Sequence, residues 1–393
     1  LSEAGSRHAL EQALGMLDLK PINNNQTSFN GLSAITDYGA SKSEIYKKCP
    51  NLDESTGKIL EGTSLISQKG KKIQVRRGTY SRTTQEVIVA SSDGTFARDI
   101  RLYQSIGLNA LALDKEYRSS VGRRYGSTSS PNQLFEWNID KSVDEIVESA
   151  NKMLYAKYVE AGQMPAVLAN KFGGVIFHEA CGHLLETTQL ERGTSPFKDK
   201  INQKIAHTAV TAIDEGITEN AFGTLSMDDE GMPPQETVLI ENGILKTFLS
   251  DRAGELRTGY KRTGSGRRQS YAFPAASRMR NTYIDKGTYT PNQLIESIDK
   301  GIYCKSMGGG SVGATGQFNF SVEEAYLIEQ GKLTTPLKGA TLIGEAKDIL
   351  PKISMCANDL DLAAGYCGSI SGNINVTVGQ PHIKVDSITI GGR

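Results

Sequence analysis

Two histidines and a glutamate stand close together in an apolar stretch of this sequence. His178, Glu179 and His183 lie within residues 175–186, which read VIFHEACGHLLE. Neutral imidazoles are common ligands of zinc, and a carboxylate beside them can take a proton from an attacking water molecule. The stretch therefore offers the groups of a hydrolytic zinc site.

The spacing of the two histidines differs from that of the common zinc-protease motif. In H-E-x-x-H both imidazoles lie on one helix face, whereas His183 comes five residues after His178. On an ideal α-helix this step points the two side chains roughly 140° apart. A shared metal then requires a local distortion, and we expect a π-bulge that Gly182 makes easier. For the hexapeptide alone, two histidines with unrelated partners are the better interpretation.

A longer series of ordered blocks resembles the TldD/PmbA family of metallopeptidases, and in particular its TldD branch. The first block is HEAxGHxLE at 178–186, followed by RGTS at 192–195. Further blocks are DDEG at 228–231, IENGILK at 240–246, NTY at 281–283, GGG at 308–310, EAYLIE at 324–329, KGATLIG at 338–344 and GQP at 379–381. The resemblance is close from about residue 165 to the C-terminus and looser over 74–124. It implies an α/β N-terminal domain and a β-rich C-terminal domain that holds the metal.

A catalytic zinc usually has three protein ligands and one open position, so a third ligand is needed. The residues alone leave several candidates open: His207, His382, Glu186 and the cysteines, of which Cys181 follows His178 by three positions. The resemblance implies Cys367, which stands just before Gly368 and ahead of the GQP block. Cys181 and Cys356 are then expected to be buried apolar residues. Glu186 shares a helix face with His183 and is expected to orient it rather than to bind the metal.

The resemblance also implies that Glu179 is the general base that deprotonates the attacking water. The alternative is that Glu179 only orients a ligand. For the substrate, Gly308, Gly309 and Gly310 precede an extended stretch and could form an edge on which a peptide adds as a strand. A hinge or tight bend is the alternative. The G-x-G-x-x-G match at 308–313 is not a dinucleotide site, because no helix is expected after it.

Composition excludes some partners and favours one compartment. Lys plus Arg and Asp plus Glu both total 44, so the net charge gives no support for a nucleic acid or a membrane as partner. We expect the basic run Arg257, Lys261, Arg262, Arg267 and Arg268 to be a solvated loop. No apolar run approaches the roughly 18 residues of a membrane span. Five scattered cysteines favour a reduced, cytoplasmic protein.

Local patterns predict an α+β protein with two domains. Strand signals over 72–124, with a turn at Asp93-Gly94, predict an antiparallel meander. A capping box at Ser142 and Glu145 predicts the start of a helix. The predicted boundaries are 1–160 for an N-terminal α/β domain and 161–393 for a C-terminal, β-rich and barrel-like metallopeptidase domain. Because the chain begins with Leu1, the first domain need not be complete.

The sequence therefore predicts a zinc-dependent peptidase that hydrolyses unfolded or small peptides. The resemblance implies a dimer, in which the catalytic chain pairs with a related subunit that lacks the metal motif. A homodimer is the alternative assembly. The rival function is a non-catalytic peptide-binding or scaffolding module in which a metal is only structural.

Overall fold

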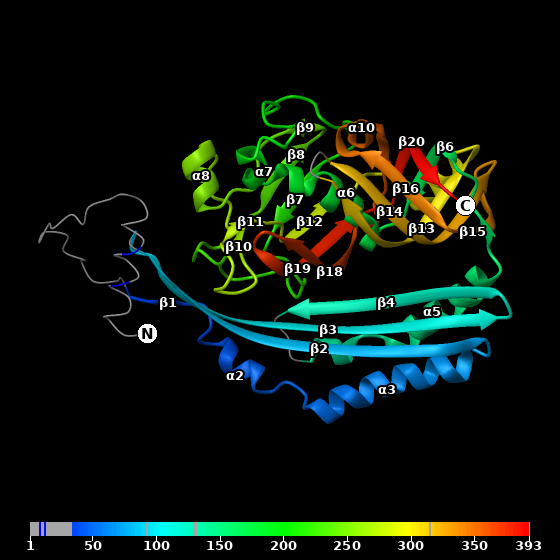
Figure 1. Cartoon of the computed structure of the whole chain (residues 1–393), viewed down its shortest axis with the longest axis horizontal. Coiled ribbons are helices and arrows are strands. Elements are labelled where there is room, and N and C mark those ends of the chain that lie inside the picture. The colour runs from blue at the N-terminus through cyan, green and yellow to red at the C-terminus, as the bar shows by residue number, and fades with distance from the viewer. Residues whose placement is uncertain are drawn as a thin grey trace, which may run out of the picture.

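The computed structural model describes residues 34–91, 93–128, 132–313 and 316–392, together with His8 and Gln12. Two domains lie one above the other in Figure 1, with the β-rich C-terminal domain over the long strands of the first domain. The fold is α+β with a barrel in its second domain, as predicted. Among the described helices none is long and apolar enough to cross a membrane.

The first domain is a sheet with two long helices on one face. Its elements are β1 (Thr36–Asp37), α2 (Lys42–Tyr46), α3 (Leu52–Lys69), β2 (Ile73–Ala90), β3 (Phe96–Asp114), β4 (Tyr117–Thr128), α4 (Gln133–Glu136) and α5 (Ile139–Leu154). β2, β3 and β4 form the predicted antiparallel meander, and β1 adds to β3 in parallel. Residues of α3 and α5 share one apolar core with β3 and β4. The second domain covers the opposite face, which is why successive residues of β3 are buried.

One local prediction for this domain is confirmed and another is wrong. The turn at Asp93-Gly94 closes the β2–β3 hairpin as predicted, with the Ser91 amide bonded to the Thr95 carbonyl at 2.9 Å. The predicted capping box at Ser142 is wrong, because α5 already begins at Ile139. The Asn138 side chain caps this helix by accepting from the Lys141 amide at 2.9 Å.

The second domain contains a closed barrel. In the described part of the chain, five strands pair in a ring: β6 (Gly162–Leu168), β13 (Lys300–Val312), β14 (Gln317–Glu329), β16 (Ala340–Glu345) and β20 (Ile383–Gly391). The antiparallel β13–β14 pair closes the ring, and three short strands extend it: β5 (Lys157–Tyr158), β15 (Lys332–Lys338) and β17 (Ile353–Cys356). Because β13 is a strand, the G-x-G-x-x-G match at 308–313 does not open a helix, as expected.

A second sheet stands beside the barrel. Its strand order is β18 (Asp361–Ser369), β19 (Gly372–Gln380), β12 (Asn281–Ile284), β7 (Ala212–Glu215), β8 (Thr237–Glu241) and β9 (Ile244–Leu245). A short hairpin, β10 (Gly266–Arg267) and β11 (Ala276–Ser277), lies nearby. The helices of this domain are η1 (Lys171–Gly174), α6 (Val175–Ala180), η2 (Gly182–Leu185), α7 (Thr187–Glu191), α8 (Arg252–Thr258), α9 (Pro291–Glu296), α10 (Ala346–Ile349) and η3 (Leu350–Lys352). Residues of α6 and η2 pack with barrel residues and with β7 and β8 in one large core.

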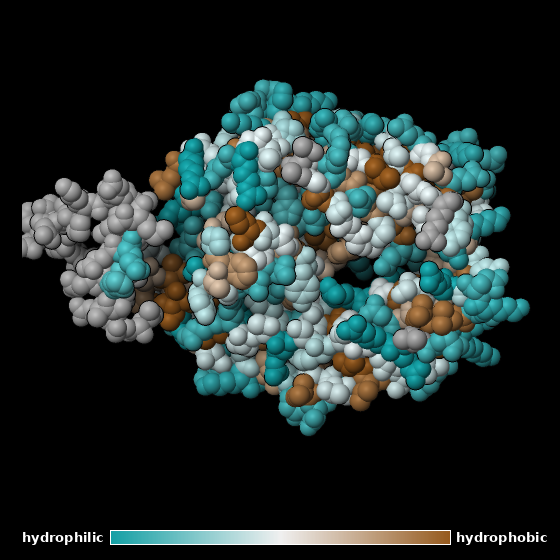
Figure 2. Space-filling model, viewed as in Figure 1, coloured by the Kyte–Doolittle hydropathy of each residue, from teal (hydrophilic) through white to brown (hydrophobic). Residues whose placement is uncertain are grey.

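A buried ion pair joins the two domains. The guanidinium of Arg101 in β3 lies 2.8 Å from an Asp229 carboxylate oxygen and also donates to the Met227 carbonyl. Both side chains of the pair are almost fully buried. The contact fixes the meander against the second domain, and Figure 2 shows the surface hollowed where the two domains meet.

Candidate metal centre

The motif histidines lie on two successive short helices. α6 ends at Ala180, Cys181 is a turn residue, and η2 begins at Gly182 as a 3₁₀ helix. The expected π-bulge is wrong: the five-residue step is accommodated by a break between two helices. A β-carbon at Gly182 would lie 2.1 Å from the sulfur of Met279, so this close packing requires glycine at the break.

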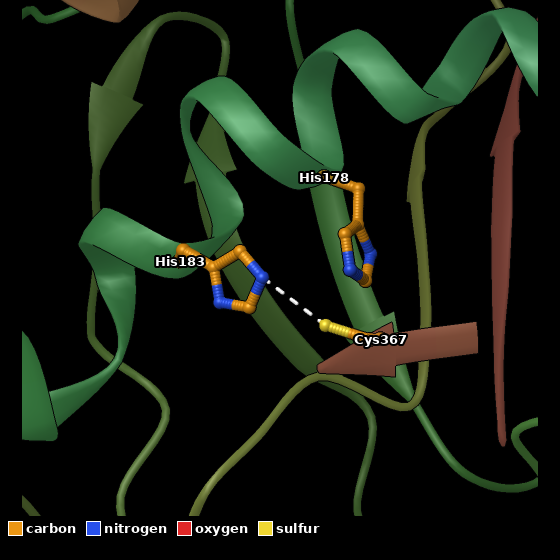
Figure 3. Close-up of side chains that lie close together, drawn as sticks. All are labelled: His178, His183 and Cys367. Atoms are coloured by element: carbon orange, nitrogen blue, oxygen red, sulfur yellow. Dashed lines mark hydrogen bonds between the residues drawn. The ribbon is translucent and has the colours of Figure 1, made fainter. Parts of the chain in front are cut away.

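The break turns both imidazoles toward the end of β18. His178, His183 and Cys367 each offer one donor atom, and these atoms lie within 4.8 Å of one another. The Cys367 sulfur is 3.1 Å from Nε2 of His183. Figure 3 shows the three side chains pointing at one another, two from consecutive helical turns and one from the strand. The structure therefore brings together the three residues predicted as metal ligands.

This donor set fits zinc. Neither ring nitrogen of the buried His178 has a hydrogen-bond partner among the described residues. A buried polar group without a partner is costly, so the ring is placed for an additional ligand. Zinc bonds of about 2.0–2.3 Å in a tetrahedron place donors roughly 3.3–3.8 Å apart. The donors here lie within 4.8 Å of one another, with the Cys367 sulfur and His183 Nε2 at 3.1 Å. Imidazole nitrogens and thiolate sulfur are both among the ligands by which proteins bind zinc.

The electrostatics of the site favour the thiolate. Burial by itself raises the pKa of Cys367, but the imidazoles of His183 and His178 outweigh burial and hold this pKa well below its usual range. Burial lowers the pKa of His183, whereas Glu186 and Cys367 raise it well above its ordinary value. A thiolate is the form of cysteine that binds metals. Because the raised pKa favours the protonated ring, a metal that binds His183 must displace this proton.

The two glutamates near His183 have different surroundings. Glu186 is buried, and its carboxylate lies 3.2 Å from Nδ1 of His183, so Nε2 points toward Cys367. This contact matches the orienting role expected for Glu186. The Glu179 carboxylate lies 3.7 Å from Nε2 of His183, and its side chain is 25% exposed. Glu179 therefore stands beside the same nitrogen with access to solvent.

The other ligand candidates lie elsewhere. Cys181 is fully buried in the core, and burial raises the pKa of its thiol. Cys356 is also buried in the core, as expected. The ring of His207 accepts from the Ala209 amide, and His382 bonds to Asp359 and Tyr303. The structure does not bring these side chains into the group formed by His178, His183 and Cys367.

Residues of β13 line two cavities. A cavity of about 280 Å³ adjoins the metal centre and is lined by Glu179, His183, Leu184, Gln189, Val312, Gly313, Gly368 and Ser369. A larger one of about 570 Å³ lies between the domains, and β13 contributes Gly308 and Gly309 to its lining. A β-carbon would clash with Ser321 at Gly308 and with Phe320 at Gly310, but would meet nothing within 4 Å at Gly309. Of the three glycines, Gly309 alone faces open space.

Some residues around the site could not be assigned from local sequence. Arg267, expected in a solvated loop, is buried and donates to the carbonyls of Met279 and Asn375. Arg278 is buried as well and donates to the Cys367 carbonyl at 2.7 Å. Neither position carries a local signal of burial.

Comparison with known proteins identifies the family. Residues 45–154 match the PmbA/TldA metallopeptidase central domain, and residues 161–392 match the PmbA/TldA metallopeptidase C-terminal domain. The metalloprotease TldD homolog of Buchnera aphidicola is 41% identical over 364 residues, covering 88% of this chain and 75% of that protein. A zinc metalloprotease TldD homolog of Saccharolobus solfataricus is 32% identical over 332 residues, 77% of this chain and 74% of that protein.

A solved structure shares the fold. The crystal structure of TldE from Thermococcus kodakarensis superposes with a TM-score of 0.75 at 20% identity, covering 100% of this chain and 86% of that one. At this identity the likeness concerns the architecture only. The two domain matches and the close sequence relatives show that the chain belongs to the TldD/PmbA family of metallopeptidases.

Proposed function

We propose that the chain is a zinc-dependent peptidase that hydrolyses unfolded or small peptides. The observation that carries this proposal is the convergence of the His178, His183 and Cys367 donor atoms within 4.8 Å, beside a cavity lined by Glu179. A purely structural zinc is usually closed by four protein ligands, whereas a catalytic zinc keeps one position open. Three donors, of which His183 lines the adjoining cavity, favour the catalytic arrangement.

His178, His183 and Cys367 would hold the metal, and a zinc ion there would supply a Lewis acid that polarises a carbonyl and lowers the pKa of water. Glu186 keeps the His183 ring in the orientation that presents Nε2. The fit of the donor set comes from the buried imidazole of His178, which has no protein partner in the described residues. Curated relatives bear the names metalloprotease and zinc metalloprotease, in agreement with this assignment.

Glu179 is the general base in this proposal. Its carboxylate reaches the cavity and lies 3.7 Å from Nε2 of His183. From this place it can take a proton from the attacking water and return the proton to the leaving amine. Val312 and Gly313 line the same cavity as Glu179.

The substrate would be held by its backbone on a strand edge. β13 pairs with β14 along its length, but with β6 only over Ile302–Cys304. From Lys305 to Val312 its other edge has no strand partner among the described residues. The register shift between Met307 and Gly310 is a bulge, in which the Gly309 carbonyl accepts from Ser321 Oγ of β14 at 2.9 Å. The other edge keeps backbone groups that have no strand partner among the described residues. An extended peptide could satisfy such groups whatever its side chains are.

A second strand flanks the same path. β18 is the edge strand of its sheet and pairs with β19 alone in the described chain. Its Ala363 and Ala364 line the interdomain cavity, and its Gly368 and Ser369 line the cavity at the metal centre. β13 and β18 therefore each contribute to the lining of both cavities. Over about four residues at roughly 3.3 Å each, this path corresponds to about 13 Å of extended peptide.

The assembly and compartment belong to the same proposal. A dimer, either with a related subunit that lacks the motif or with a second copy, would enclose the cavity and limit entry to flexible peptides. The family resemblance supports the pairing with a related subunit. All five cysteines are free thiols in this structure, which is compatible with a reducing, cytoplasmic setting.

Zinc content and peptide cleavage, measured on the same preparation, test the proposal. We expect stoichiometric zinc, cleavage of unstructured peptides, and loss of both when a chelator removes the metal. Peptides N-methylated at the paired amides should be poor substrates, whereas methylation at the alternate amides, which point away from the edge, serves as the control. Zinc binding without cleavage of any unstructured peptide would favour the non-catalytic scaffolding module instead.

A further inference from the structure

A short segment between β11 and β12 contacts both parts of the metal centre. On one side Met279 packs against Gly182, the residue between the two histidines in the helix break. On the other side a terminal nitrogen of Arg278 donates to the Cys367 carbonyl at 2.7 Å. Two adjacent residues therefore link the histidine-bearing helices to the cysteine-bearing strand.

Arg278 also holds the turn that follows Cys367. Its other terminal nitrogen donates to Ser371 Oγ at 2.6 Å and to the Gly372 carbonyl at 3.1 Å. Cys367 pairs with Ile374 near the end of the β18–β19 hairpin, with two residue pairs remaining before the turn. Strand ends next to a turn are the places where a sheet opens most easily. One guanidinium thus ties the ligand strand to the tip of its own hairpin.

The charge of Arg278 has no carboxylate partner in the described part of the chain. Its side chain is fully buried, its three hydrogen bonds go to two carbonyls and a hydroxyl, and Nε has no partner there. A buried cation is costly unless it is paired, and apolar residues of similar volume can often replace buried charged groups that have only a structural role. The two terminal nitrogens of the Arg278 guanidinium donate to separate groups, which the forked shape of this side chain allows.

Arg280, two residues further along the same segment, shows the ordinary arrangement. It is equally buried, but its guanidinium lies 2.7 Å from the Asp214 carboxylate in a closed ion pair. The guanidinium also donates to the Asp214, Thr263 and Gly264 carbonyls and to the Thr237 hydroxyl, and not to Cys367. Both arginines are buried and lie in the same short segment. Only Arg278 donates a hydrogen bond to β18, the strand that carries Cys367.

We propose that Arg278 is a positioning residue of the metal centre. It fixes the Cys367 carbonyl and the β18–β19 turn, and so keeps the Cys367 sulfur within reach of the two imidazoles. This role rests on the metal site proposed above. Groups that orient metal ligands typically change metal affinity 10- to 100-fold when they are replaced.

The test compares Arg278→Lys with Arg280→Lys in the full chain. Both variants keep the charge and lose the fork, so both should lose some thermal stability. Zinc affinity is measured by chelator competition on folded protein, and cobalt-loaded protein reports the metal–thiolate bond through its charge-transfer absorption. We expect Arg278→Lys to lower zinc affinity by about tenfold or more and to weaken the absorption, with Arg280→Lys like the wild type.

Ser371→Ala is a second variant that removes one contact of Arg278 with little risk to the fold. It should lower zinc affinity in the same direction and less strongly. Wild-type affinity and absorption in both Arg278→Lys and Ser371→Ala would overturn the role, as would an equal loss in Arg280→Lys. If the wild type binds neither metal, or if Cys367→Ser binds zinc as tightly, the metal site itself is wrong and the role of Arg278 fails with it.

Discussion

Glu179 and Glu186 stand on either side of His183, and replacing each by glutamine should separate chemistry from metal binding. The Glu179 side chain is 25% exposed and faces the cavity. The Glu186 side chain is 1% exposed and contacts Nδ1 of His183 at 3.2 Å. Both substitutions preserve size and remove a charge. A difference between the two variants must therefore come from position.

Glu179→Gln removes the only group proposed to accept a proton. An amide cannot take this proton, and general-base catalysis typically contributes 10²- to 10⁴-fold. At about 1.4 kcal/mol per factor of ten, this corresponds to about 3–5 kcal/mol of activation free energy. We expect kcat to fall by that factor, with KM and zinc content close to the wild type, because the carboxylate is not one of the three converging donors.

Glu186→Gln should have the opposite profile. Its carboxylate orients His183 and raises the pKa of that ring, so its loss should weaken zinc binding about 10- to 100-fold. At saturating zinc, kcat should remain within about tenfold of the wild type. The assay is cleavage of an unstructured fluorogenic peptide at several zinc concentrations, beside chelator competition. Cleavage by Glu179→Gln within tenfold of the wild type would refute the assignment of the base, and so would an equal, zinc-independent loss in Glu186→Gln.

Three further predictions concern the ligands and the substrate edge. Cys367→Ser should lower zinc affinity by at least about tenfold, whereas Cys181→Ser should keep the metal; the reverse pattern in chelator competition would assign Cys181 as ligand. Because the pKa of His183 is raised above its ordinary value of 6.5, zinc must displace a proton at and above that pH, and zinc affinity should rise with pH. Calorimetry in buffers of different ionisation enthalpy measures the released proton, and a pH-independent affinity would contradict this expectation. Gly309→Val should raise KM for many peptides without changing zinc content, because a β-carbon there meets nothing within 4 Å; unchanged kinetics would exclude Gly309 from the substrate edge.

The sequence predicted those parts of the structure that depend on local patterns. Alternating residues and the Asp93-Gly94 turn were enough for the meander of β2, β3 and β4. Local patterns could not supply the third ligand, because Cys367 is 184 residues from His183 and only the resemblance pointed to it. The sequence predicted a distortion between the two histidines, but as a π-bulge and not as a break between two helices. The break depends on Met279, a distant residue that packs against Gly182. In the same way, the burial of Arg267 follows from carbonyls supplied by distant segments.

The buried His178 ring, which has no hydrogen-bond partner among the described residues, lowers the stability of the fold. An unpartnered buried polar group costs about 1–3 kcal/mol, and an apolar side chain would avoid that cost. The imidazole instead points at a thiolate whose pKa is held down by the same two histidines. These donors come from helices packed in the barrel core and from the edge of a separate sheet, so they meet only when both are folded together. A metal that binds this assembled site and not the unfolded chain would return about 4 kcal/mol at a free concentration 1,000 times its Kd, more than the unpartnered ring costs. At such a concentration, metal binding would more than offset the cost of leaving the His178 ring without a partner.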